Sequence, residues 1–411
     1  MIFFRNLNLF LCAIYAGFVL AVDVNLDIKP TLKNQKIQKE IIKKLKEDHF
    51  FKVNNIEDIN NIFHEKLIES LDPSKVYFTK LEFEQYGNNL NDESFDLNNS
   101  FRILNKYFNR LIEATSYQIE ILKDFNFDFS KSEYLDIYSE DNEWKSSFTE
   151  LRKEWFLLAK NDLLNEILDE DLSDETDSRQ TIIDRYERRI RRITQRTNED
   201  YFSIIMNNFT SQFDPHSAYL SPKSAEDFDM QMSLSLEGIG ALLGIEDDYA
   251  KVVSLVPGGP AAKSNQLSPD DRIVSIRQAY EEKSTDVVGW RIDEIVKLIR
   301  GDAGTEVELE IMPSKSLESS ERKFVTLVRE EVQLEEQAAK SKIISIDSES
   351  RNYKVGIIEL PAFYIDFNAW RERDPNFRSS SRDVENILRS FNKDNVDAVL
   401  VDLRGNSGGS L

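Results

Sequence analysis

The sequence predicts an α+β protein of several domains, and three observations support this. Glycine is almost absent from the first half, where Gly87 is the only glycine between Gly17 and Gly238. From Met232 onward, glycines, prolines and short apolar runs become frequent. Near the end of the chain, a strand, a helix and another strand are predicted in succession. At 411 residues the chain is also longer than one ordinary domain.

Residues 22–230 are predicted to form a helical amino-terminal domain. Apolar residues recur at intervals of three and four, for example Leu104, Phe108, Leu111 and Ile112 between residues 101 and 125. The shortage of glycine agrees with this prediction, because glycine costs about 1 kcal/mol in a helix interior.

Residues 1–21 are predicted to be a cleaved signal peptide. An apolar run is followed by Val19, Leu20 and Ala21, which suit the positions read by a signal peptidase. The run is short and early for a membrane span, although an uncleaved anchor is the alternative. The only cysteine, Cys12, lies inside this run. The mature chain would therefore have no disulfide, no thiol catalysis and no cysteine-based zinc site.

The charge balance argues against a nucleic-acid partner. The formal net charge is -22, and such a surface repels phosphate backbones. An arginine-rich stretch, residues 185–196, could be taken for a nucleic-acid patch. It follows an acidic segment, residues 169–178, that is predicted to be a solvated loop. We therefore expect the arginines to pair with acidic neighbours on a helix.

Residues 231–332 are predicted to form a small β-rich domain with one main helix. Strands are expected at residues 252–256, 272–276 and 307–311, each bounded by turn residues. Helical spacing over residues 292–299 is followed by Gly301, a typical stop signal.

A glycine-containing motif precedes these strands. In residues 235–241, Gly238 and Gly240 flank Ile239, so successive backbone N–H groups can point inward and bind a carboxylate. The strand that follows could then pair with an extended peptide. Taken alone, an ordinary glycine turn explains the motif equally well.

The order of this motif and its neighbours resembles a bacterial PDZ domain. The motif is followed by Leu255-Val256-Pro257-Gly258-Gly259-Pro260-Ala261-Ala262, by Leu267-Ser268-Pro269-Asp270-Asp271-Arg272-Ile273-Val274-Ser275-Ile276 and by the helix up to residue 299. The resemblance implies that the amides of Ile239, Gly240 and Ala241 hold the terminal carboxylate of a peptide. It also implies that Leu243 and Ile295 line the pocket for the last side chain.

Residues 333–411 are predicted to begin an α/β layer, with strands at 355–360 and 398–403 and a helix at 383–391. The stretch 401–410 has three interpretations. A phosphate loop would need a lysine that is missing. A trypsin-like serine loop would need a histidine and an aspartate on two barrels, but His49, His64 and His216 lie in or beside helical sequence. The third interpretation is a strand that leads into an oxyanion loop.

The third interpretation matches a family. Asp402-Leu403-Arg404, Asn406 and Gly408-Gly409 resemble the tail-specific, or C-terminal processing, peptidases, in particular their long periplasmic branch. Residues 71–78, 213–222 and 232–240 are also similar to that family. The resemblance implies a periplasmic serine endopeptidase that selects apolar carboxyl termini and uses a serine and a lysine. Amides of Gly408 and Gly409 would stabilise the oxyanion, and His216 would be a structural residue at a helix end.

The same resemblance implies no cofactor and no metal ion. The expected partners are unfolded or tagged periplasmic proteins, cell-wall hydrolases and a lipoprotein adaptor. The family's Ser-Ala-Ser-Glu type motif and its lysine have no match up to Leu411, so we expect residues 333–411 to be an incomplete, inactive protease core. Ser407 and Ser410 lie in the oxyanion loop and are not expected to be nucleophiles. The alternative function is a non-catalytic PDZ module that binds carboxyl-terminal tails.

Overall fold

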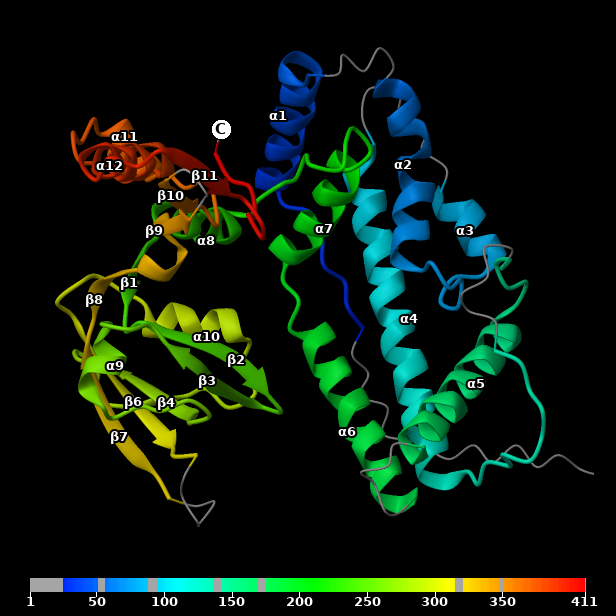
Figure 1. Cartoon of the computed structure of the whole chain (residues 1–411). Coiled ribbons are helices and arrows are strands. Elements are labelled where there is room, and N and C mark those ends of the chain that lie inside the picture. The colour runs from blue at the N-terminus through cyan, green and yellow to red at the C-terminus, as the bar shows by residue number, and fades with distance from the viewer. Residues whose placement is uncertain are drawn as a thin grey trace, which may run out of the picture. The chain divides into compact units, whose positions relative to one another are not determined.

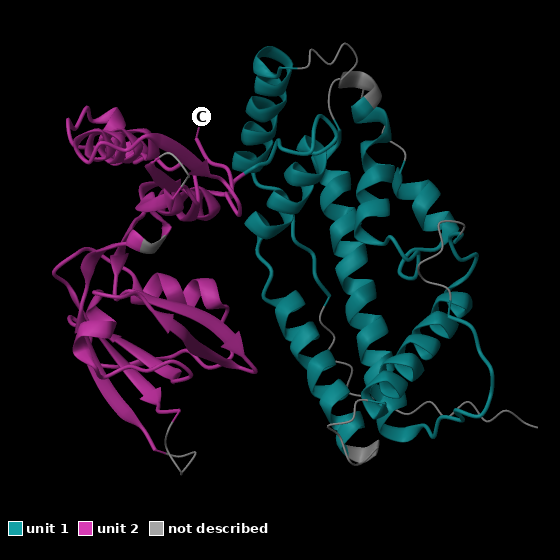
Figure 2. Cartoon of the chain, viewed as in Figure 1, with its two compact units in different colours: residues 1–219 teal, residues 220–411 magenta. Residues whose placement is uncertain are grey.

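The computed structural model describes residues 25–50, 56–87, 95–135, 142–168, 175–314, 321–347 and 351–410. The chain divides into two compact units, residues 1–219 and 220–411 (Figure 2). Within the described ranges, no helix is both long enough and apolar enough to cross a membrane. The predicted signal peptide, residues 1–21, lies outside these ranges.

Unit 1 is helical, which confirms the prediction for the first half of the chain (Figure 1). Its described helices are α1 (Leu32–Asp48), α2 (Ile56–Leu71), α3 (Lys80–Gly87), α4 (Leu97–Asp124), α5 (Phe148–Ile167), α6 (Glu175–Thr194) and α7 (Asn198–Thr210). The longest, α4, begins at the N-cap Asp96, whose side chain accepts a bond from the amide of Asn98. It packs against α2, α5, α6 and α7, so it is the centre of the unit.

The core of unit 1 is rich in aromatic side chains. The rings of Phe63, Phe95 and Phe209 are almost fully buried, with centroids 4.2 Å apart for Phe63 and Phe95 and 4.7 Å apart for Phe95 and Phe209. Such contacts add to the stabilisation that burial of these large side chains provides.

The segment between α2 and α3 is organised by Asp72, which is buried. Its carboxylate accepts hydrogen bonds from the amides of Val76 at 2.9 Å, Tyr77 at 2.7 Å and Phe78 at 3.0 Å. Burial raises the pKa of Asp72, and the amide bonds oppose that rise. This part of the 71–78 motif therefore has a structural role in unit 1.

The start of α6 corrects one prediction. Residues 175–178, expected to belong to a loop, lie within α6, and Ser178 is buried. Acidic residues are favourable at a helix amino terminus because they interact with the helix dipole. Among the arginines that follow, Arg185 pairs with Glu166 at 2.9 Å, while the guanidinium of Arg189 lies 4.9 Å from the ring centre of Tyr186.

Unit 2 begins with α8 (Pro222–Ser233), which the sequence had placed at the end of the helical domain. A six-stranded sheet follows, with the order β2-β3-β4-β6-β7 and β5 paired to β4. Its strands are β2 (Ala241–Glu246), β3 (Tyr249–Leu255), β4 (Arg272–Gln278), β5 (Thr285–Asp286), β6 (Glu306–Met312) and β7 (Lys323–Val328). Helices α9 (Pro260–Ser264) and α10 (Ile292–Ile299) belong to the same domain. The predicted β-rich domain with one main helix is confirmed.

The first and last strands of this domain pair with each other. β1 (Ser235–Gly238) and β8 (Glu330–Gln333) form an antiparallel ribbon in which Ser235 is opposite Gln333 and Gly238 is opposite Glu330. A short 3-10 helix, residues 335–337, leads from the ribbon to the next sheet.

The last part of unit 2 is a three-stranded sheet of β9 (Lys340–Asp347), β10 (Asn352–Glu359) and β11 (Ala398–Asp402). β10 and β11 are parallel and are connected through α11 (Phe367–Arg371) and α12 (Ser380–Lys393), as the predicted strand, helix and strand require. β9, which was not predicted, pairs with β10 antiparallel. Val399, Leu400 and Val401 of β11, an outer strand of this sheet among the described residues, are each about half exposed.

Candidate functional site

The loop between β1 and β2 presents backbone N–H groups that have no hydrogen-bond partner among the described residues. The carbonyl of Ile239 accepts a hydrogen bond from Ala261 N, and that of Gly240 accepts one from Val256 N, each at 2.8 Å. In contrast, the amides of Ile239 and Gly240 donate no hydrogen bond among the described residues. Gly240 has a φ of 69°, in the left-handed region that favours glycine. A loop with its carbonyls engaged and its amides available can bind an anion such as a carboxylate.

β2 continues directly from this loop and lies at the edge of its sheet. Its outer backbone edge has no partner strand among the described residues, and its side chains Leu242 and Ile245 are about half exposed. An extended peptide could add to such an edge as a further strand. The structure therefore brings together the predicted residues Ile239, Gly240, Ala241 and Leu243, the last of which is partly buried against the core.

α10 packs close to β2. The predicted pocket residue Ile295 is fully buried in the domain core. Ile292, one turn earlier on the same helix, is only partly buried against that core. Helical spacing alone does not distinguish the fully buried Ile295 from the partly buried Ile292.

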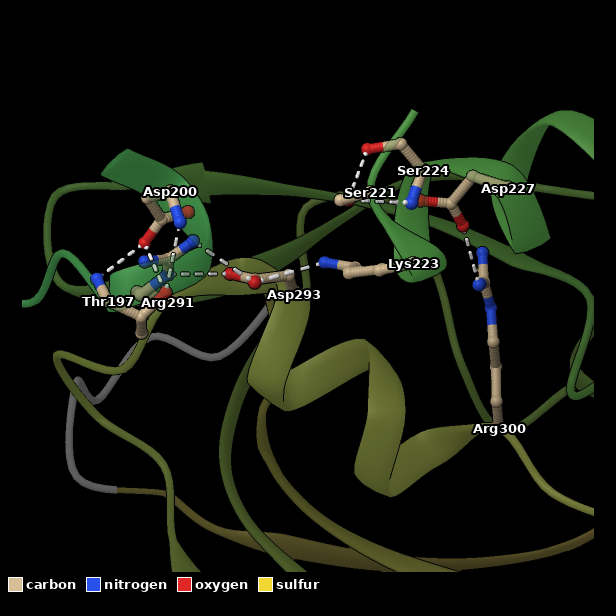
Figure 3. A network of polar contacts seen from close by, with 9 residues as sticks. All are labelled: Thr197, Asp200, Ser221, Lys223, Ser224, Asp227, Arg291, Asp293 and Arg300. Carbon is tan, nitrogen blue, oxygen red and sulfur yellow. Dashed lines mark hydrogen bonds and ion pairs between the residues drawn. The ribbon is translucent and has the colours of Figure 1, made fainter. Parts of the chain in front are cut away.

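Ion pairs connect α8 to both ends of α10 (Figure 3). Lys223 Nζ lies 3.0 Å from Asp293 Oδ2, and Arg300 Nη1 lies 2.8 Å from Asp227 Oδ1. Burial lowers the pKa of Lys223, and the neighbouring carboxylates oppose that change. Partly exposed pairs of this kind contribute little to stability, so their main effect is to orient α8 along α10.

The glycine loop after β11 is held by the segment that follows β10. The amide of Phe363 donates to Gly408 O at 2.7 Å, and the amide of Ser410 donates to Phe363 O at 2.8 Å. The side chain of Asn406 donates to Leu360 O at 2.8 Å and accepts from Gly408 N at 2.7 Å. Of the two predicted oxyanion donors, the Gly408 amide is therefore engaged in this structure. The Gly409 amide donates no hydrogen bond in the described part of the chain.

A charged pair precedes this loop. Arg404 bonds the carboxylate of Asp402, with 2.6 Å between Nη2 and Oδ2, and lowers the pKa of Asp402 to about 2. Asp402 therefore stays ionised at neutral pH, and it also accepts the amide of Arg404. The hydroxyls of Ser407 and Ser410 form no hydrogen bond within the described ranges, so no base activates them there.

The Asp-Pro-His-Ser stretch after α7 is organised by Asp214. His216 lies in a turn, is exposed, and donates its backbone amide to Asp214 Oδ1. Asp214 Oδ2 also lies 2.6 Å from His49 Nε2 and accepts the hydroxyl of Ser217. These bonds, from Ser217 first and then His49, hold the pKa of Asp214 well below its usual range. Ser217 bonds to the carboxylate instead of the imidazole, so this is not a catalytic triad.

No group of three or more His, Cys, Asp or Glu side chains suited to a metal ion occurs in the described residues.

Comparison with known proteins identifies two domains. The family described as "Tail specific protease N-terminal domain" matches residues 41–223, and "PDZ domain" matches residues 227–312. The second match covers most of the six-stranded sheet domain, including the 238–240 loop and α10.

Curated relatives match over longer stretches. The tail-specific protease of Haemophilus influenzae is 32% identical over 402 residues, which is 93% of this chain and 54% of that protein. The carboxy-terminal processing protease CtpA of Bacillus subtilis is 26% identical over 219 residues, 53% of this chain and 40% of that protein. This chain thus spans about half the length of these relatives. A crystal structure of the PDZ domain of a Vibrio cholerae carboxy-terminal protease with a peptide is 47% identical, covering 24% of this chain and 99% of that one, with a TM-score of 0.23.

Proposed function

Because this chain belongs to the tail-specific, or C-terminal processing, protease family, we propose that β2, the loop before it and α10 form a groove that binds the free, apolar carboxyl terminus of a polypeptide. The observation that carries the proposal is the pair of unengaged amides at Ile239 and Gly240, placed at the start of an open strand edge. The amides can donate hydrogen bonds to the carboxylate, and the strand edge can pair with the peptide backbone. The apolar residues around Leu243 can pack against the last side chain.

Titration calorimetry of the chain with paired peptides tests this proposal. One peptide ends in a free apolar residue, and its partner carries a terminal amide instead of the carboxylate. A charge-assisted hydrogen bond is worth about 1.5–3 kcal/mol, so the amide peptide should bind about tenfold more weakly or worse. Equal affinity for the two peptides would leave the loop as a plain structural turn.

For the whole protein, the proposal is a serine endopeptidase. The tail is held in the groove while a serine, activated by a lysine, attacks an internal carbonyl group of the same polypeptide. This chain contributes the glycine loop, where the Gly409 amide is available to an oxyanion. Gly408 could join it once Asn406 releases the Gly408 amide.

Binding of tails without cleavage is the second candidate function of this chain. It is favoured by Ser407 and Ser410, whose hydroxyls have no base in the described residues. The chain should therefore not hydrolyse an unfolded protein with an apolar tail. Turnover above that of a chain carrying Ser407→Ala and Ser410→Ala would rule this candidate out.

The setting we propose is the bacterial periplasm, with unfolded or tagged exported proteins and cell-wall hydrolases as substrates and a lipoprotein adaptor as partner. The support is the predicted signal peptide and the bacterial relatives. Edman sequencing of the protein from cells should begin at Val22. Recovery of intact Met1 from the cytoplasm would contradict the proposed export.

A further inference from the structure

Arg329, between β7 and β8, is a buried charge without a carboxylate partner. Only 3% of its surface is exposed, and it forms no ion pair among the described residues. Its guanidinium donates instead to five neutral acceptors: Ile299 O at 2.7 Å, Leu298 O at 3.0 Å, Gln278 Oε1 at 2.7 Å, Thr305 Oγ1 at 2.9 Å and Glu306 O at 3.1 Å. Burial of an unpaired charge is costly, so a buried guanidinium of this kind is expected to have a specific role.

Two of the five acceptors explain what the charge does. Leu298 and Ile299 are the last residues of α10, and a helix carries a partial negative charge at its carboxyl end. The guanidinium binds both of these carbonyls directly. Gly301 lies flat against it, since a Cβ atom at Gly301 would be 3.1 Å from Arg329 Nε. Burial lowers the pKa of Arg329, but a guanidinium remains charged at neutral pH.

The same end of α10 lies beside the loop that presents its amides. A Cβ atom at Gly238 would be 3.8 Å from Arg300 Cγ, directly after α10. Gly238 is also opposite Glu330, the residue that follows Arg329, in the ribbon of β1 and β8. Arg329 is therefore connected to the start of this loop in two ways. Its side chain binds the end of α10, and its main chain continues into Glu330, which pairs with Gly238.

This arrangement matters for a negatively charged ligand. Without the guanidinium, the negative end of α10 would lie beside the loop whose amides we propose to bind a carboxylate, and the two negative charges would repel. With it, the last carbonyls of α10 are neutralised and fixed to β4 and β6 through Gln278 and Glu306.

We propose that Arg329 is a positioning residue for carboxylate capture: it neutralises and fixes the carboxyl end of α10, so that the adjacent loop amides can donate hydrogen bonds to a ligand carboxylate. The inference rests on the proposed function of the groove. It predicts an effect on the carboxylate specifically, because a terminal amide carries no charge for the helix end to repel.

The test uses the full chain and the paired acid and amide peptides. Arg329→Met should lower affinity for the acid peptide about tenfold and leave affinity for the amide peptide unchanged, so the preference for the acid falls toward one. Arg329→Lys should retain an intermediate preference, because it keeps the charge and loses the fork of donors. The control is Arg277→Met, which removes a partly exposed arginine paired with Glu308 on the same sheet and should keep the full preference.

A merely structural role would weaken binding of both peptides in parallel and leave their ratio intact, which overturns the inference. If the parent chain itself binds both peptides equally, the proposed function fails first. A second measurement needs no variant. The nuclear magnetic resonance signal of Arg329 Nε–H in the parent should shift with the acid peptide and stay in place with the amide peptide. Equal shifts with the two peptides would also overturn the inference.

Discussion

The ring of Phe391 occupies the space that a side chain at residue 356 would need. A Cβ atom built on Gly356 of β10 would lie 2.3 Å from Cε2 of Phe391 on α12, far inside van der Waals contact. Because Phe391 is also buried, α12 can approach β10 this closely only over a glycine.

We therefore expect Gly356→Ala to destabilise the last sheet by about 1–3 kcal/mol, as overpacked cores do. Phe391→Leu should recover part of that loss when combined with it, because the smaller side chain leaves room for the new methyl group. Denaturant unfolding of the two single variants and the double variant measures the coupling. Strictly additive effects would show that the two positions are not in contact.

Gly240 should be intolerant of a side chain for two reasons. Its φ of 69° disfavours a β-branched residue by about 1–2 kcal/mol, and a Cβ atom there would lie 3.2 Å from the Cα of Gly259. Gly240→Val should therefore weaken acid-peptide binding about tenfold or more, measured by calorimetry.

Gly289→Val is the matched control for this variant. Gly289 has a φ of 77° in the same domain, but a Cβ atom there would meet nothing within 4 Å. It should show a similar loss of thermal stability with peptide affinity preserved. Loss of binding in both variants would mean that backbone strain alone, without crowding of the loop, accounts for the effect.

In the glycine loop, Gly409 and Gly405 should respond differently to alanine. A Cβ atom on Gly409 would lie 2.3 Å from the carbonyl oxygen of Phe363, whereas one on Gly405 would meet nothing within 4 Å. Gly409→Ala should break the pairing of the loop with Phe363. Hydrogen exchange at the amides of Phe363 and Ser410 should then accelerate in Gly409→Ala and stay near the parent rate in Gly405→Ala. Unchanged exchange in both variants would refute this pairing.

The helical unit should lose stability in mild acid because of His64. This side chain is fully buried, with Nε2 2.9 Å from Ser100 Oγ, and burial lowers its pKa from 6.5 to about 4. The unfolded chain therefore binds the proton more readily between these values, so stability falls as the pH drops from 6.5 to 4. The loss reaches about 3 kcal/mol at pH 4.

Urea unfolding between pH 4 and 7.5, followed by circular dichroism, measures this slope. His64→Gln should flatten it in that window, because glutamine can donate to the same acceptors without titrating. His216→Gln, at an exposed position, should leave the slope unchanged. An equal slope in all three proteins would assign the acid sensitivity to other groups.

Sequence patterns within a short segment predicted the helices and strands whose formation depends on that segment alone. The bounds of α10 agree with the predicted residues 292–299, because its apolar spacing ends at a glycine signal. The sequence alone did not predict β9, since its residues mix lysine, serine and isoleucine and its strand depends on pairing with β10. The contacts of α8 with α10 were missed for the same reason, because they join segments far apart in the chain.

In the candidate site, too, some features were predictable from the local sequence and others were not. The glycines of the 238–240 loop were predictable, since turns with left-handed backbone require them. The hydrogen bond from the Gly408 amide to the Asn406 side chain was not predictable from the sequence. Asparagine side chains can bond to several nearby backbone groups, and the sequence does not say which one is chosen. Arg329 carried no sequence signal, since its acceptors are mostly carbonyls that any residue supplies.

The ribbon of β1 and β8 has a consequence for how such a protein can change over evolutionary time. Because Ser235 and Gln333 are opposite each other, the chain enters and leaves the PDZ domain at nearly the same point. Domains whose ends are adjacent tolerate insertion and exchange, since the flanking chain keeps its spacing. Recombination could therefore replace residues 236–332 with another domain while the surrounding sequence stays as it is.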